Sequence, residues 1–263
     1  MRKSVLVIVM IALVSVAFAQ KKKKNEKTEP AKQEAAPQPA PTKPTVAAKS
    51  DSTPQPNRPQ MSQLTQHYAV KYQIAVQWND PEVAKDALYD LIIENQGNDS
   101  LIYELAYYYY SNQKYPSAVL VSQELLKRNP KNPAALEMSA VGYENIGVFD
   151  RALQSYESLY LLQSNPTVLY KMAFLQLRLK RFKEGATSAD ILMADKTIET
   201  LKVTYTGTDG KGKEYPMKAA VLNLKGMISQ EQGDKVAARA FFQQALVISS
   251  DFPPAKENLT KLK

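Results

Sequence analysis

The sequence predicts an all-α protein built from about five stacked helix-turn-helix repeats, and three observations support this. A small residue recurs at intervals of 34, 33 and 53 residues, the last being 34 plus 19, at Ala106, Ala140, Ala173 and Gly226. A second small residue follows each one by twelve positions, at Ala118, Ala152, Gly185 and Ala238. Apolar residues also recur with the period of a helix buried on one side, as in Ile102, Leu105, Ala106 and Tyr109.

The fullest copy of this pattern lies in residues 133–165, where it reads Leu136, Ala140, Tyr143, Gly147, Phe149, Ala152, Tyr156 and Leu159. It resembles the tetratricopeptide repeat (TPR) family, whose 34-residue units stack side by side. The resemblance implies a right-handed α-solenoid, with repeats at 65–98, 99–132, 133–165, 166–199 and 219–252. Gln176 and Ser229 depart from it, because the family usually has tyrosine there.

Residues 200–218 interrupt the period, and we expect them to form a β-hairpin insert. Val203 and Tyr205 alternate with polar residues, and Asp209-Gly210 is a strong signal for a two-residue turn. The alternative is a mobile loop between the fourth and fifth repeats.

The last eleven residues, 253–263, are expected to form a capping helix. Ala255, Leu259 and Leu262 fall on one face of it, with charged residues elsewhere. A terminal repeat otherwise leaves an apolar face in water, so the capping helix completes a repeat domain that spans 61–263.

Residues 1–19 have the three parts of a secretory signal peptide: a basic start, an apolar run, and Ala17-Phe18-Ala19 before Gln20. We therefore expect an exported protein, periplasmic or secreted. The apolar run is shorter than the roughly 20 residues that span a bilayer. The alternative is an N-terminal membrane anchor, which the basic block Lys21 to Lys24 would favour.

Residues 20–60 read as a disordered linker rich in lysine and proline. They hold eight prolines and no aromatic residue, so they cannot bury enough apolar surface to offset the entropy of ordering. A solvated spacer is one role for this tail, and association with the cell envelope is another.

The charge and composition exclude several functional classes. The formal charge of +8 belongs mainly to the N-terminal tail, because residues 61–263 carry 23 basic and 22 acidic residues, or +1. Nucleic-acid binding by the repeat domain is therefore not expected. The chain has no cysteine and one histidine, so we expect no metal site. Serine and threonine are scattered and no glycine-rich phosphate loop is present, so we expect no cofactor and no enzyme activity; catalysis is kept as a minor alternative.

We expect a protein-protein interaction scaffold in the cell envelope, because the resemblance implies a concave groove lined by the first helix of each unit. Those helices carry a second stripe that one core does not need: Tyr103, Tyr107, Tyr110, Glu137, Val141, Glu144, Tyr170, Phe174 and Leu177. Aromatic residues of the second and fourth repeats would thus flank the acidic residues Glu137 and Glu144 of the third. This arrangement predicts a protein or peptide partner with apolar and basic side chains.

Two alternatives to this groove remain open. The aromatic residues could instead pack against neighbouring repeats or the insert. The protein could also be a self-associating structural subunit of an envelope assembly. The family's lysine, asparagine and arginine clamp for a C-terminal carboxylate is not expected, because Tyr103, Glu137 and Tyr170 replace the cations.

Overall fold

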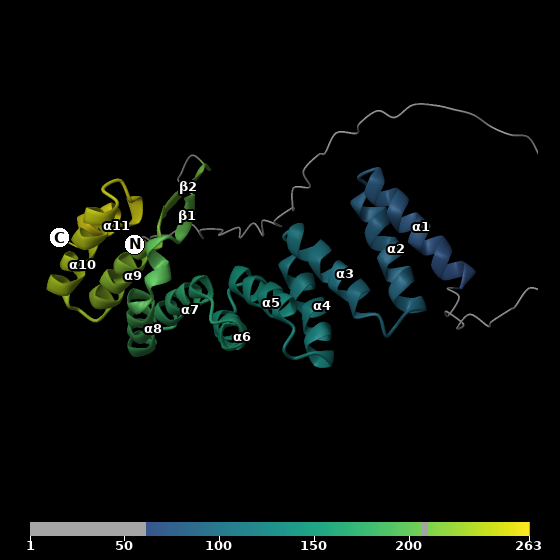
Figure 1. Ribbon diagram of the computed structural model, residues 1–263, viewed down its shortest axis with the longest axis horizontal. Helices are drawn as coiled ribbons and strands as arrows, with labels where there is room; N and C mark the ends of the chain where they lie inside the picture. Colours follow the sequence, from purple (N-terminus) through teal and green to yellow (C-terminus); the bar gives the residue numbers. More distant parts are fainter. Residues whose placement is uncertain (1–61, 207–209, 263) are drawn as a thin grey trace, which may run out of the picture. The chain divides into compact units, whose positions relative to one another are not determined.

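The computed structural model describes residues 62–206 and 210–262 of the chain (Figure 1). The predicted signal peptide and linker lie outside this part. Consecutive helices pack against one another in pairs, which confirms the predicted stack of helix hairpins. The pairs are α1 Gln63–Gln77 with α2 Pro81–Glu94, α3 Asp99–Ser111 with α4 Tyr115–Arg128, α5 Pro133–Asn145 with α6 Phe149–Gln163, α7 Pro166–Arg178 with α8 Phe182–Ala194, and α9 Met217–Glu231 with α10 Lys235–Ile248.

Asparagine and proline together start two of the first helices. Asn132 accepts a hydrogen bond from the backbone N–H of Ala135 at 3.1 Å, and Pro133 is the first residue of α5. Asn165 and Pro166 start α7 in the same way. The side chain satisfies an amide that has no partner within the helix, and proline lacks the amide that would go unpaired. The dipeptide therefore both ends one repeat and begins the next.

One residue in the turn of every hairpin has a left-handed backbone, with φ between 55° and 86°: Asn79, Gln113, Gly147, Lys180 and Gly233. The next residue donates its N–H to a carbonyl five positions earlier, as Asp80 does to Ala75 at 2.8 Å. This bond is part of the Schellman motif that ends a helix. Glycine fills only two of the five positions, although it adopts this conformation with least strain.

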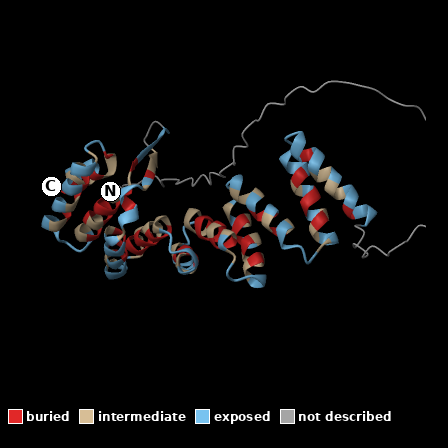
Figure 2. Ribbon diagram, in the orientation of Figure 1, coloured by how far each residue is buried: buried red, intermediate tan, exposed pale blue. Residues whose placement is uncertain are grey.

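The recurring small residues allow the two helices of a hairpin to approach closely. A Cβ atom at Gly226 would lie 2.4 Å from the ring of Phe242 on α10, closer than any real contact. Ala140 and Ala152 are fully buried in the α5–α6 hairpin. Figure 2 shows buried residues along the faces where helices meet and exposed residues on the opposite faces. The close packing explains the spacing of small residues in the sequence.

The insert forms the predicted β-hairpin, preceded by the short 3-10 helix η1 Lys196–Glu199. Strands β1 Lys202–Thr206 and β2 Gly212–Pro216 pair antiparallel, from Lys202 opposite Pro216 to Thr206 opposite Gly212. The predicted turn at Asp209 lies outside the described residues. Tyr215 is buried, and its ring lies 5.1 Å from that of Phe252, so the hairpin packs onto the C-terminal part of the stack.

The predicted capping helix is also present, as α11 Pro253–Lys261. It packs against α10 and α9 and buries Ala255, while Leu262 just after it joins a cluster with Ala238 and Phe242. The final hairpin is therefore covered on its outer side.

Candidate functional site

The first helices of the second and third hairpins lie side by side, since α3 contacts α5 directly. We call the surface that they present the first-helix face; it carries Tyr103, Tyr107 and Tyr110 of α3 and Glu137 and Glu144 of α5. The rings of Tyr103 and Tyr107 stack at 6.3 Å with an angle of 15° between their planes. Tyr107 is 50% exposed, whereas Tyr103 and Tyr110 are partly buried against the core. The exposed ring of Tyr107 is thus held in place by a partly buried neighbour.

Glu137 lies close enough to influence these tyrosines. Burial raises the pKa of Tyr103 and of Tyr110, and the negative charge of Glu137 raises both pKa values further. In the described part of the chain, Glu137 makes no hydrogen bond and no ion pair. Its carboxylate is therefore available to a ligand that reaches the tyrosines.

Glu144 takes part in a chain of hydrogen bonds that joins three helices. Lys171 of α7 donates to the hydroxyl of Tyr156 on α6 at 3.2 Å, and that hydroxyl donates to Glu144 of α5 at 3.2 Å. Burial raises the pKa of Tyr156 and lowers the pKa of Lys171, while the negative charges of Glu144 and Glu137 both act against the shift at Lys171. Glu144 is therefore less available to a partner than Glu137.

The other predicted residues are placed more deeply. Val141 and Leu177 are buried. Tyr170 and Phe174 pack on a cluster that includes Leu224 and Ile228 of α9, and burial raises the pKa of Tyr170 to about 12. The α7 aromatic residues thus pack against a neighbouring repeat, as the alternative reading of the sequence expects. The exposed aromatic surface of the predicted groove is concentrated on α3.

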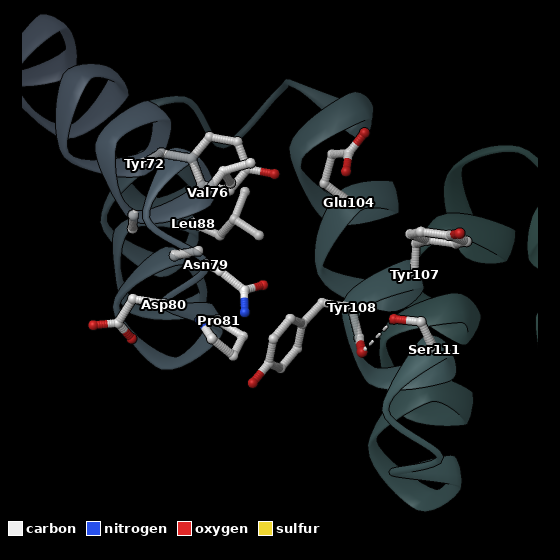
Figure 3. Close-up of a pocket in the computed structure, with 12 residues that line it drawn as sticks. Tyr72, Val76, Asn79, Asp80, Pro81, Leu88, Glu104, Tyr107, Tyr108 and Ser111 are labelled. Atoms are coloured by element: carbon white, nitrogen blue, oxygen red, sulfur yellow. Dashed lines mark hydrogen bonds between the residues drawn. The ribbon is translucent and has the colours of Figure 1, made fainter.

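A pocket of about 260 Å³ opens between the first hairpin and α3, beside Tyr107 (Figure 3). Tyr72 and Val76 of α1 and Leu88 of α2 lie across it from Tyr108 of α3. Glu104 and Tyr107 border the pocket on α3, and the side chain of Tyr107 points away from the first hairpin. The volume suits one side chain of a partner rather than a whole small-molecule ligand. Within the described residues, Glu104 forms no hydrogen bond or ion pair, so a second available carboxylate borders this pocket.

A third carboxylate near the pocket is already neutralised. Glu82 accepts hydrogen bonds from Lys85, from Lys114, and from the hydroxyl of Tyr108 at 2.8 Å. These donors lower the pKa of Glu82 to about 2. Glu82 holds the hydroxyl of Tyr108 at the pocket wall. Among the described residues, Asp80 and Glu104 at the pocket and Glu137 on the adjoining first-helix face form no ion pair, and Asp80 accepts a hydrogen bond from the backbone of Val83.

The described residues contain no group of three or more His, Cys, Asp or Glu side chains that could hold a metal ion. None of the helices in that same part of the chain has the length and hydropathy needed to cross a bilayer.

Sequence reasoning missed Lys171, Glu104 and the pocket. Lys171 precedes Phe174 by three positions and thus shares its helix face, which was the available signal. The pocket gave no local signal, because its walls come from three helices that only tertiary packing brings together.

No protein-family model matches the sequence, and a search of curated proteins finds no match. Several solved structures are similar in fold. The chain resembles MamA residues 41 to the end from Desulfovibrio magneticus RS-1, with a TM-score of 0.55 at 14% identity over 73% of this chain and 98% of that one. Another crystal structure of MamA gives 0.56 at 12% identity, covering 76% and 96%.

YrrB, described as a TPR protein with an unusual peptide-binding site, gives a TM-score of 0.58 at 12% identity over 72% of this chain and 89% of that one. At these identities the likeness concerns the fold. The chain therefore has the TPR-like helix-hairpin fold that the repeat pattern predicts.

Proposed function

We propose that this protein is a non-catalytic scaffold that binds a peptide or protein segment on its first-helix face. The observation that carries the proposal is the stacked pair Tyr103 and Tyr107: the ring of Tyr107 is exposed, and Tyr103 lies near the carboxylates of Glu104 and Glu137, which form no ion pair among the described residues. The peptide-binding site named for YrrB, a protein of similar fold, agrees with this use of the surface.

The chemistry favours a partner with apolar and basic side chains. Exposed aromatic rings held by packing are frequent anchors of binding energy, because a partner desolvates them without ordering them further. A lysine or arginine could lay its aliphatic stem on Tyr107 and place its charge near Glu104 or Glu137. Acidic partners would meet two unpaired carboxylates and be disfavoured.

The test compares short fluorescent peptides in which leucine alternates with lysine, glutamate or glutamine. The lysine peptide should bind most tightly, and Tyr107→Ala should weaken it by about 2 kcal/mol, or roughly thirtyfold. Glu137→Gln should weaken the lysine peptide selectively and reduce the salt dependence of its binding. Fluorescence anisotropy gives the affinities.

Leu161→Ala is the matched control, because Leu161 is an exposed apolar residue on the second helix α6. It should leave binding unchanged. Equal binding of all three peptides, or unchanged affinity in Tyr107→Ala with a lowered melting temperature, would contradict the proposed site. Phe174→Ala should instead destabilise the fold, because Phe174 packs against α9.

Export and envelope location belong to the same proposal. They rest on the sequence of residues 1–19 and not on the folded part. Intact-mass analysis from the native host should find a chain that begins at Gln20. A chain that keeps residues 1–19 in the membrane fraction would instead indicate an anchor.

A further inference from the structure

One face of the first helix is apolar and uncovered. His67, Val70, Ile74 and Trp78 follow one another at i, i+3, i+7 and i+11, so they lie on one side of α1 and just past its end. We call this the α1 outer face. The buried residues of α1, Thr65 and Ala75, point the other way. Trp78 is 76% exposed, and Val70 and Ile74 are exposed as well.

In the third and fifth hairpins, the equivalent positions are covered by a helix; in the second and fourth, Val70 corresponds to the charged Glu104 and Lys171. The left-handed turn residues Asn79, Gly147 and Gly233 align α1 with α5 and α9, at offsets of 68 and 154 residues. These offsets carry His67, Val70 and Ile74 onto Ala135, Met138 and Gly142, and onto Val221, Leu224 and Ile228.

All six of those equivalents are buried, whereas Trp78 corresponds to Ile146 and Gln232, which are exposed. Met138 and Ala135 pack with Leu125 of the preceding helix α4, and a Cβ at Gly142 would lie 2.5 Å from Val119 of α4. The part of the α1 outer face formed by His67, Val70 and Ile74 therefore has the form of a surface that a helix covers in the third and fifth hairpins. In the part of the chain that the structure describes, no helix precedes α1 to do so.

Two segments of this chain are poor candidates for covering it. The outward side of α11 carries Lys256, Glu257 and Lys261, so a head-to-tail contact would place charges on apolar residues. The sequence before Ser62 has eight prolines between positions 30 and 59, and proline interrupts the helix that the surface calls for.

The α1 outer face is compatible with itself. Helix α1 contains no Asp, Glu or Arg, and its one lysine, Lys71, forms ion pairs with Asp86 at 3.2 Å and Asp90 at 3.3 Å. The polar neighbours on one side of the stripe are the uncharged Gln63, Gln66, Gln73 and Gln77. Lys71 adjoins its other side, four residues after His67 and three before Ile74, and the two ion pairs offset its charge. In a twofold contact each side chain meets a copy of the same surface, so a charged face would repel itself; this one does not.

We propose that two copies of this chain associate through their α1 outer faces, α1 against α1 about a twofold axis. One helix face from each copy is a small interface, so the dimer should dissociate in roughly the micromolar range. The contact leaves both first-helix faces open, because it uses the opposite side of α1 from the pocket. A dimer would thus offer two binding surfaces to one multivalent partner.

Trp78 makes the test direct, because it is the only tryptophan of the chain. We would use the chain from Gln20 onward, which keeps every described residue and omits the apolar run from Val5 to Ala19. Sedimentation velocity across a concentration series should show a monomer-dimer equilibrium. Trp78 emission should move to shorter wavelength, and acrylamide quenching should fall, over the same concentrations.

Ile74→Glu and Ile74→Lys should each weaken the dimer by roughly a hundredfold, because like charges then face each other across the axis. Mixing the two variants should restore a dimer. Val247→Glu is the matched control, since Val247 is an exposed apolar residue on α10. Far-ultraviolet circular dichroism should be the same for all variants.

A monomer at every concentration, a dimer unaffected by Ile74→Glu, or a mixture that stays monomeric would each overturn the proposal. An emission shift caused by phosphatidylglycerol vesicles, without self-association, would overturn it too and assign the face to a membrane. Peptide binding by the Ile74→Glu monomer tests the proposed function separately, so either proposal can fail without the other.

Discussion

The two ends of the helix stack are finished in different ways. At the C-terminal end, α11 covers α10 and the β-hairpin packs against Phe252, so that Phe242, Leu262 and Phe252 are all buried. At the N-terminal end, α1 buries only Thr65 and Ala75. Figure 2 shows α1 largely in the exposed and intermediate colours.

This difference separates stability from interaction. A repeat in the interior of a stack is stabilised by a neighbour on each side, and a terminal repeat has only one. The C-terminal end supplies its missing neighbour from the chain itself. The N-terminal hairpin keeps apolar groups in water and also forms one wall of the pocket beside Tyr107. We therefore expect mutations at the C-terminal end to affect folding, and mutations at the N-terminal end to affect binding and association.

The largest expected contrast is between two aromatic residues. Phe242→Ala should cost about 3–5 kcal/mol of unfolding free energy, because the ring is 0% exposed and fills the space over Gly226. Trp78→Ala should change it by less than about 0.5 kcal/mol. Urea unfolding at low protein concentration, where dimers are absent, measures both. Similar losses at the two sites would refute the contrast between the ends.

A smaller contrast lies in the turns of the same two hairpins. Gly233 has φ 86°, with nothing near its Cα that a methyl group would touch, so Gly233→Ala should lose about 1 kcal/mol through backbone strain alone. Asn79 has φ 55°, a conformation that glycine adopts with less strain, so Asn79→Gly should raise the unfolding free energy. The gain should be only a few tenths of a kcal/mol, because asparagine tolerates this conformation better than most residues.

Urea denaturation measures both changes, provided that the variants and the unmodified chain show the same dependence of unfolding free energy on urea concentration. A gain from Gly233→Ala would mean that the turn relaxes out of the left-handed region. Gln113→Gly offers a control within the interior of the stack, and should gain more than Asn79→Gly because glutamine lacks asparagine's local tolerance.

The smallest expected effect is electrostatic. The donors around Glu82 lower its pKa to about 2 from an ordinary value of 4.5. A lowered carboxyl pKa stabilises the fold above the ordinary value, and that stabilisation is lost as pH falls toward about 2. Glu82→Gln should therefore make the melting temperature fall less steeply over this range than it does in the unmodified chain.

The effect should shrink in high salt, since the group is exposed. If the melting temperature of the Gln variant depends on pH as that of the unmodified chain does, the interactions of Glu82 with Lys85, Lys114 and Tyr108 do not stabilise the fold. Asp251, whose pKa is lowered by Lys213 and Ser249, is the corresponding carboxylate at the C-terminal end and a useful comparison.

Much of the architecture could be predicted from local patterns. The spacing of small residues, the Asn-Pro starts and the alternation around Val203 each reflect a constraint that acts within one hairpin. The candidate site was only partly predictable. Tyr107 could be found from its position on α3, whereas the pocket beside it, and the hydrogen bonds from Lys171 to Tyr156 to Glu144, join helices of different repeats.

The sequence by itself determined which residues form helices, where each helix begins, and which side of each helix is apolar. These properties depend on capping, backbone preference and periodicity along a few neighbouring residues. Only the tertiary structure decided which apolar stripes are covered. Phe174 and Tyr107 occupy the same place in their repeats, yet Phe174 packs against α9 whereas Tyr107 is half exposed, because burial depends on the neighbouring helix.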